Sequence, residues 1–317
     1  MNQPLVVTSQ DGLHLPAIID GAGERARRRF IEFFVAEIRN PNTRKAYARA
    51  VGRFCHWCDD RDLDLQDIEP AHVAAYVETH PASVATVKQH LAALRMLFNY
   101  LVVGQVIPVN PALSVRGPRL VAVEGQTPVL TAGETAQLLA AIDTNRISGL
   151  RDRALIGVMV FSFARVSAVI GMLVEDYYAV GKRWKFRFRE KGGKKRVLPV
   201  HPQAEEYLDG YLEAAGIGEE KKTPLFRSIN QRRQLTDRSM HRTDVLQMVK
   251  RRARQAGLPD NICCHSFRGT GITTYLQNGG TLEVAQYLAG HASAKTTKIY
   301  DRRRQHVGLE EIVKIRI

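Results

Sequence analysis

CCHSFRGTGITTYLQNGGTLEVAQYLAGHASAKTTKIYD, from Cys263 to Asp301, is the stretch of this sequence that decides the fold. His265 and Arg268 stand three residues apart, His291 closes an Ala-Gly-His turn, and Tyr300 follows nine residues later. A tyrosine is an oxygen nucleophile, a histidine can accept its proton, and arginine and histidine can bind phosphate oxygens. The stretch has no paired carboxylates to hold a metal. These residue types together indicate phosphoryl transfer through a covalent tyrosine.

Size and charge limit the classes of partner. The chain has 317 residues, which favours about two domains. Its 46 Lys and Arg residues exceed its 32 Asp and Glu residues, so the formal net charge is +14. A polyanion is therefore the expected partner, and an anionic membrane surface is a weaker alternative because no basic amphipathic helix stands apart. No apolar run approaches the roughly 18 residues of a membrane span and no signal peptide is evident, so we expect a cytoplasmic protein without membrane contact.

Apolar residues recur at helical spacing through the first third of the chain. Val87, Leu91, Leu94, Phe98 and Leu101 follow one another at three- and four-residue steps, which is typical of one buried face of a helix. Similar stripes upstream predict a four-helix unit, and a stretch rich in Pro and Gly follows it. We therefore divide the chain into a flexible N-terminal arm (1–23), a helical domain (24–115), a linker (116–127) and a second domain with a C-terminal tail (128–317).

The period of the sequence changes in the second domain. Trp184, Phe186 and Phe188 alternate with basic residues, which is typical of a half-buried β-strand. Gly192-Gly193 supplies a turn, and a second strand is predicted over residues 196–200. Helical spacing returns after this hairpin. The predicted fold class is therefore mainly α with a small antiparallel β-sheet.

Two places upstream of the deciding stretch carry further candidate residues. Arg165 is the only charge in the apolar stretch SFARVSAVI, where it is either half of a buried ion pair or a clamp for a phosphate; both interpretations stay open. Lys191 lies at the tip of the predicted hairpin, where nearby arginines would lower its pKa from the usual value of about 10.4 and suit it for donating a proton. Lys194 and Lys195 are equally good candidates on chemistry alone.

The segment Cys55–Cys58 contains the CxxC spacing of a metal half-site. No second pair of ligands follows at a suitable spacing, and Cys58 lies on an apolar helix face with Phe54. We therefore predict that both cysteines belong to a core and that the protein has no metal site.

Six residues, in chain order, carry a family resemblance: Arg165, Lys191, His265, Arg268, His291 and Tyr300. Their order, the His-x-x-Arg spacing, the Gly-His turn and the nine-residue step to Tyr resemble the signature of the tyrosine recombinases, also called phage-type integrases. The segment TRKAY at 43–47 resembles the start of the second helix in the family's N-terminal core-binding domain, so the resemblance covers residues 24–317. The ending TTKxYDRR is most similar to integrases of plasmids and mobile elements.

The resemblance implies a fold and a reaction. The fold would pair a helical, SAM-like core-binding domain with a mixed α/β catalytic domain. Tyr300 would attack a DNA phosphodiester and become linked to the 3′ phosphate, with His265 handling its proton. The two arginines and His291 would bind the phosphate oxygens, and Lys191 would protonate the leaving 5′ oxygen. The phosphotyrosine keeps the bond energy, so the resemblance implies no metal and no other cofactor.

The resemblance also implies partners. These are specific sites in double-stranded DNA and three further copies of the chain, as a tetramer on two DNA sites. The two domains would close a C-shaped clamp on the duplex, and the reaction would pass through a Holliday junction. We predict DNA contacts from Thr43, Arg44, Lys45, Tyr47, Lys88, Lys194, Lys195 and Arg196.

Two positions depart from the family pattern. Ala168 stands where an acidic residue that supports the site is common, and Gly269 stands where a His often follows the second Arg. Neither change removes a group that handles the phosphate. Two other functions stay open, a non-catalytic DNA-binding accessory protein and a type IB topoisomerase-like enzyme. The apolar terminus Leu309–Ile317 is expected either to fold back on its own domain or to dock on a neighbouring protomer.

Overall fold

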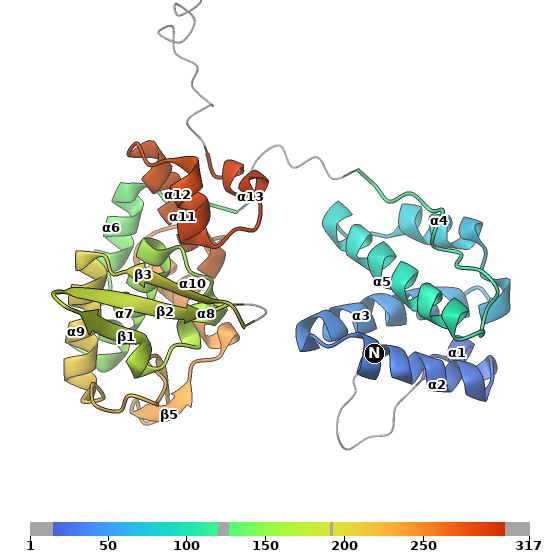
Figure 1. Ribbon diagram of the computed structural model, residues 1–317, viewed down its shortest axis with the longest axis horizontal. Coiled ribbons are helices and arrows are strands. Elements are labelled where there is room, and N and C mark those ends of the chain that lie inside the picture. Colours follow the sequence, from blue (N-terminus) through green and yellow to red (C-terminus); the bar gives the residue numbers. More distant parts are fainter. Residues whose placement is uncertain (1–14, 120–126, 191–192, 302–317) are drawn as a thin grey trace, which may run out of the picture. The chain divides into compact units, whose positions relative to one another are not determined.

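A computed structural model describes residues 15–119, 127–190 and 193–301. The chain folds into two compact units, Met1–Val121 and Ala122–Ile317, and their boundary falls within the predicted linker. Both units are built mainly of helices, and the second also contains a small antiparallel sheet (Figure 1), which confirms the predicted fold class. Lys191 and the predicted C-terminal tail lie outside the described residues.

The first unit is helical, and its helix starts follow from local sequence. The Asn40 side chain accepts hydrogen bonds from the backbone N–H groups of Asn42 and Thr43, and Pro41 fits the first helical position because it has no N–H to leave unpaired. Ser83 caps a later helix through the N–H of Thr86. The elements are α1 (Ala17–Gly21), α2 (Glu24–Glu32), the π-helix η1 (Phe33–Glu37), α3 (Pro41–Asp59), the 3₁₀ turn η2 (Leu65–Asp67), α4 (Pro70–Thr79) and α5 (Val84–Val103).

The core of the first unit forms where α3 packs against α5. Phe54 meets Phe98 edge to face with ring centroids 5.9 Å apart, and Leu94 is fully buried beside them. Cys55 and Cys58 are buried in the same core, as predicted from the apolar stripe. Burial raises the pKa of Cys58 to about 12, so its thiol stays protonated at neutral pH.

Residues 15–23 differ from the loose arm that the sequence predicted. They include the short helix α1, and its Ile18 and Ile19 are buried in the core that also contains Phe30. A helix of five residues is too short to show an apolar period, so the sequence pattern could not reveal it.

The first helix of the second unit begins with a capping box. The Thr131 hydroxyl accepts from the N–H of Glu134 at 3.1 Å, and the Glu134 carboxylate accepts from the N–H of Thr131 at 2.7 Å. The helices are α6 (Ala132–Ala140), α7 (Ile147–Ser162), α8 (Val166–Ile170), α9 (Pro202–Ala215), α10 (Arg242–Gln255), α11 (Cys264–Gln277), α12 (Leu282–Ala289) and α13 (Ala294–Lys298), with a 3₁₀ turn, η3 (Val174–Asp176).

A three-stranded antiparallel sheet, in the order β1-β2-β3, lies in the second unit. Phe186 faces Leu198 and Phe188 faces Arg196 across β2 and β3, and both Phe rings are buried, which confirms the predicted hairpin. β1 and a separate hairpin were not predicted, because strands of three to five residues are too short to show alternation. The strands are β1 (Tyr177–Val180), β2 (Arg183–Arg189), β3 (Lys195–Pro199), β4 (Arg227–Ile229) and β5 (Leu235–Ser239).

Helix α7 is mostly buried, and it packs against both α9 and α11. Gly271 of α11 lies directly on α7, since a Cβ on this residue would stand only 2.2 Å from the Val160 carbonyl oxygen. α7 ends at Phe163, which adopts a left-handed conformation at φ 54°. Helices α11, α12 and α13 gather at one end of this unit (Figure 1). Arg268 of α11 donates to the Phe163 carbonyl oxygen, so the first half of α11 lies beside the end of α7.

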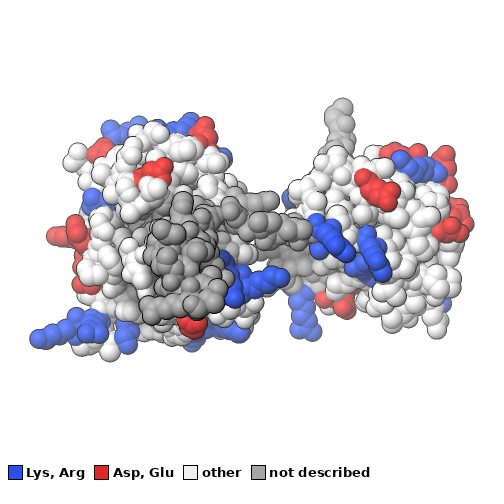
Figure 2. Space-filling view, turned by 90° about the horizontal axis from the view of Figure 1, so that it is seen from above, with Lys and Arg blue, Asp and Glu red and all other residues white. Residues whose placement is uncertain are grey.

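Basic side chains are spread over the viewed face of the molecule, with acidic side chains between them (Figure 2). In this view the basic side chains lie at several separate places on each unit, with white surface between them. Within the described part of the chain, no helix has the length and apolar composition needed to cross a membrane.

Candidate active site

Tyr300 and His265 form the centre of the candidate site. Tyr300 stands two residues after the end of α13 and is buried, and its hydroxyl lies 2.9 Å from Nε2 of His265, in the first turn of α11. Desolvation raises the pKa of Tyr300, although Arg268 and Arg165 oppose the shift, so the phenol is protonated at neutral pH. Desolvation lowers the pKa of His265, and the same two arginines lower it further. A protonated nucleophile therefore lies in contact with a neutral imidazole.

Arg268 is almost completely buried and joins the ends of two helices. Its guanidinium donates to the carbonyl oxygen of Phe163, after α7, and at 2.6 Å to that of Ala289, at the end of α12. Its Nε is buried, and among the described residues no acceptor meets it. Burial lowers the pKa of Arg268 to about 10, which leaves the group charged at neutral pH. The site thus contains a fixed cation with one donor still unused.

His291 completes this inner group. It follows Gly290, which takes the left-handed conformation at φ 60° that ends α12. Its ring is stacked on Tyr300 with centroids 6.1 Å apart, and its Nδ1 lies 2.9 Å from the Thr297 hydroxyl. Desolvation, followed by the nearby Arg268 and Arg165, lowers its pKa to about 4. His291 is therefore a neutral imidazole at pH 7, held in place by a residue of α13.

Arg165 stands at the start of α8 and is neither deeply buried nor tightly paired. Its side chain is 47% exposed, and its nearest carboxylate oxygen, on Glu190, is 3.9 Å away. The sequence left open a buried ion pair or a phosphate clamp. A side chain exposed to this extent is not half of a buried ion pair, although it lies within reach of Glu190.

Gly269 is explained by its closeness to the tyrosine ring. A Cβ at this position would lie 3.2 Å from Cε1 of Tyr300 and 3.6 Å from Val129. The ring of the candidate nucleophile therefore packs on a bare stretch of the α11 backbone. A larger side chain here would have to displace the ring or turn away from it. Ala168, the other departure, is buried in the core of its unit.

The structure thus brings His265, Arg268, His291 and Tyr300 into direct contact or close packing, with Arg165 next to them. Lys191 cannot be placed, because it lies outside the described residues. The other predicted DNA contacts divide between the units. In the first unit, α3 carries Thr43, Arg44, Lys45 and Tyr47, and α5 carries Lys88; in the second unit, Lys194 precedes β3, and β3 begins with Lys195 and Arg196.

These predicted DNA contacts differ in exposure. Lys45, Lys88, Lys194 and Lys195 are exposed, as a contact to a phosphate backbone requires. Arg44 instead donates to the Ile38 carbonyl at 2.8 Å. Arg196 is buried, and it bonds to Glu190 and to the Leu288 carbonyl oxygen inside its unit. The strand alternation indicates this inward position, because Arg196 is paired with the inward Phe188.

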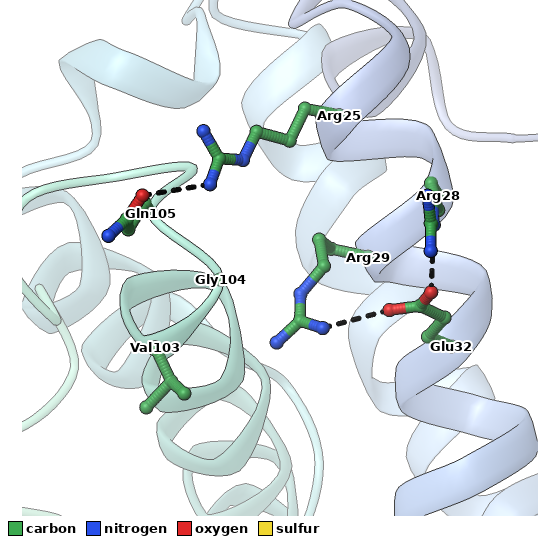
Figure 3. A pocket seen from close by; sticks show the side chains of 7 residues that line it. All are labelled: Arg25, Arg28, Arg29, Glu32, Val103, Gly104 and Gln105. Carbon is green, nitrogen blue, oxygen red and sulfur yellow. Dashed lines mark hydrogen bonds and ion pairs between the residues drawn. The ribbon is translucent and has the colours of Figure 1, made fainter.

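A pocket of about 430 Å³ lies elsewhere, in the first unit (Figure 3). Three arginines of α2 project into it, and Glu32 pairs with two of them, Arg28 and Arg29, at 2.9 Å each. Arg25 donates to the Gln105 side chain. The pocket contains none of the residues that the sequence singled out, and its one carboxylate already neutralises part of its charge.

Each of the two units matches a known protein family. Residues 128–306 match the phage integrase family, and residues 28–104 match the phage integrase N-terminal SAM-like domain. Tyrosine recombinase XerD of Corynebacterium glutamicum is 30% identical over 273 residues, which cover 82% of this chain and 86% of that protein. Tyrosine recombinase XerC of Thermodesulfovibrio yellowstonii is 30% identical over 284 residues, covering 86% of this chain and 88% of its own.

Two solved structures share the fold. XerH site-specific recombinase bound to palindromic difH substrate, in a post-cleavage complex, superposes with a TM-score of 0.71 at 21% identity, covering 92% of this chain and 88% of that one. A lambda integrase tetramer bound to a Holliday junction gives a TM-score of 0.67 at 18% identity, covering 94% and 85%. At these identities the likeness concerns the fold.

Proposed function

This chain belongs to the phage integrase family of tyrosine recombinases, and from that membership we propose that it cuts and rejoins DNA through Tyr300. It is a tyrosine-type site-specific recombinase. The observation that carries the assignment of the nucleophile is the 2.9 Å contact between the Tyr300 hydroxyl and Nε2 of His265, beside the buried cation of Arg268. A protonated phenol, a neutral base and a fixed positive charge are the groups that this chemistry requires.

The cleavage step balances with these groups. The Tyr300 oxygen attacks the phosphorus, and its proton passes to His265. A bond forms between phosphorus and the tyrosine oxygen, while the bond to the 5′ oxygen breaks. The leaving 5′ oxygen takes a proton from Lys191. Later the 5′ hydroxyl of a partner strand attacks the 3′-phosphotyrosine and reverses each transfer, so no external energy source is consumed.

Negative charge grows on the non-bridging oxygens in the transition state. We propose that Arg165 and Nε of Arg268 donate to these oxygens, and that His291 adds a neutral donor. The open guanidinium of Arg165 and the unused Nε support this assignment. Fixed donors of this kind are worth about 3 kcal/mol of barrier each. The two arginines also supply the positive charge that a metal ion would otherwise bring.

We propose double-stranded DNA as the partner and a tetramer on two DNA sites as the active assembly. DNA-bound relatives of the same fold, including a tetramer on a Holliday junction, support both points. Residues 24–115 would serve as the core-binding domain, with Lys45 and Lys88 on phosphates, and 128–317 as the catalytic domain. A cytoplasmic protein associated with the nucleoid fits this role.

Loss of the proposed general acid should be repaired chemically. Lys191→Ala is expected to slow cleavage about 100-fold with little change in DNA affinity, because a general acid acts only on the leaving group. A DNA site with sulfur in place of the bridging 5′ oxygen should restore most of the rate, since a thiolate leaves without a proton. Lys194→Ala and Lys195→Ala serve as controls. If sulfur instead restores the rate of one of these two control variants, the lysine replaced in that variant is the general acid.

The cleavage rate should depend on pH through His265. The surroundings lower its pKa, so the neutral, proton-accepting form predominates above about pH 6.5, the usual value. We expect a single-turnover rate that is level between pH 7 and 8 and falls as pH drops through the lowered pKa, where the imidazole becomes protonated. His265→Gln should be slower and lack this acidic limb. A midpoint above 6.5 would contradict the assignment.

One experiment separates this function from its two alternatives. A plasmid carrying two copies of the DNA that flanks the gene is incubated with the protein, and the covalent junction and the exchanged products are mapped. Adducts with strand exchange between sites establish a recombinase on those sites. Adducts with relaxation of a one-site plasmid would indicate a topoisomerase-like enzyme, and binding without adducts would indicate an accessory protein.

A further inference from the structure

Glu190, the residue after β2, places a carboxylate between two arginines. Its side chain is only 12% exposed. Its Oε1 accepts from Nη2 of Arg196 at 2.8 Å and from Nε at 3.1 Å, and it lies 3.9 Å from Nη1 of Arg165. A carboxylate buried to this extent requires paired charge. One oxygen of Glu190 therefore links a residue of the candidate site to a buried arginine that has no part in the chemistry.

The second oxygen of Glu190 faces the turn that leads to His291. A Cβ on Gly290 would lie 2.7 Å from Oε2, so the carboxylate touches the bare backbone at this point. Arg196 contacts the same place, since its Nε would lie 3.4 Å from that Cβ and its guanidinium donates to the Leu288 carbonyl oxygen near the end of α12. The Arg196 guanidinium also lies over the Phe188 ring, 5.2 Å from its centre. Glu190 and Arg196 together tie the end of α12 to the sheet.

The charges around this carboxylate explain why it is needed. Burial lowers the pKa of Arg196 and Arg268, and in both cases the Glu190 carboxylate opposes that shift. The positive charge of Arg165 lowers the pKa of both arginines further. Three guanidinium groups thus converge on one small region, and Glu190 is the carboxylate that contacts two of them. Without it, Arg165 would be free to turn away from its like-charged neighbours.

We propose that Glu190 is a positioning residue for strand cleavage, holding Arg165 and the Gly290–His291 turn in the arrangement that receives the phosphate. The proposal rests on the function assigned above and adds a residue to it. Glu190 touches no reacting atom in this scheme, because its effect passes through Arg165 and through the backbone before His291. Mispositioning of the groups that such a residue holds can slow cleavage about 100-fold, although DNA affinity is hardly altered.

The experiment compares Glu190→Ala, Glu190→Gln and a matched control, Glu219→Ala. Glu219 carries the same charge, its side chain is 96% exposed, and it pairs only loosely with Lys221 at 3.6 Å. Each protein is incubated with a nicked DNA site, and three quantities are measured: affinity for the DNA, the single-turnover rate of adduct formation at saturating DNA, and the thermal unfolding midpoint. The control removes the effect of one lost negative charge on DNA binding.

Glu190→Ala should form adduct about 100-fold more slowly than the unaltered protein at saturating DNA, with affinity within about twofold of the control. Glu190→Gln keeps an oxygen for Arg196 and should recover much of the rate. Arg196→Ala should show a similar defect, and combining it with Glu190→Ala should add little, because both changes break one support.

Three results would overturn the proposal. The first is an unchanged rate of adduct formation in Glu190→Ala. The second is a Glu190→Ala variant that loses only thermal stability or DNA affinity. The third is a double variant whose rate falls by the product of the two single effects of Glu190→Ala and Arg196→Ala. The unaltered protein separates this test from that of the function. If it forms no adduct at all, the assigned function fails, whereas a normal adduct in both the unaltered protein and Glu190→Ala removes only the role of Glu190.

Discussion

Tyr300→Phe is expected to abolish the covalent protein–DNA adduct while leaving affinity for a single DNA site unchanged. The substitution removes only the hydroxyl. The ring keeps its stacking on His291 and its packing on the Gly269 backbone, so the fold of the site should persist. The lost hydrogen bond to His265 is worth about 1 kcal/mol of stability, which is small beside the loss of the nucleophile.

A nicked site and a denaturing gel measure this result directly, since only a covalent complex survives denaturation. Tyr178→Phe is the matched control, because Tyr178 lies on β1, where its ring is stacked under Arg187. The control should form adduct at the normal rate. An adduct that persists in Tyr300→Phe would assign the nucleophile to another residue.

Gly271→Ala should have the largest effect on stability. The added methyl group would stand 2.2 Å from the Val160 carbonyl oxygen and 2.6 Å from the Phe163 ring, distances at which α11 must move away from α7. Overpacking of this kind costs about 3 kcal/mol, which would lower the unfolding midpoint of the second unit by about 6–12 °C. The shift of α11 would also move His265 and Arg268, so adduct formation should fall together with stability.

Gly210→Ala is the control for this prediction. Gly210 is inside α9, and a Cβ there meets no atom within 4 Å. The same chemical change should therefore stabilise the protein by about 0.5–1 kcal/mol, because alanine favours the helix more than glycine does. Differential scanning calorimetry of both variants gives the two shifts. Equal midpoints for Gly271→Ala and the unaltered protein would show that α11 and α7 are less closely packed than described.

The sequence predicted the groups whose type is set by chemistry. Tyr300, His265 and Arg268 were identified because phosphoryl transfer needs a nucleophile, a base and a cation, and these needs hold in any fold. The structure places all three together. The hairpin of β2 and β3 was predicted for a similar reason, since alternation of Phe186 and Phe188 with charged residues is a local signal.

Other features depend on contacts between distant segments and left no local signal. Glu190 could not be identified, because its importance comes from Arg165 and from the Gly290 backbone, one hundred residues further along the chain. The charge of Arg196 predicts a DNA contact. The strand alternation places this residue inward, but its hydrogen bond to the Leu288 carbonyl near the end of α12 depends on the fold. A charged residue in a basic run shows its role only once the fold brings its partners to it.

The double anchorage of Arg268 has an evolutionary consequence. Its guanidinium satisfies the terminal carbonyls of two helices, so a substitution there would leave both buried and unpaired, at about 1–3 kcal/mol each. Natural selection would remove such a variant for poor folding even where strand cleavage was no longer useful. Loss of the Tyr300 hydroxyl would break only its hydrogen bond to His265 and would leave no helix end unpaired. A descendant of this chain that became catalytically silent should therefore lose its tyrosine first and retain its arginine as a relic of the reaction.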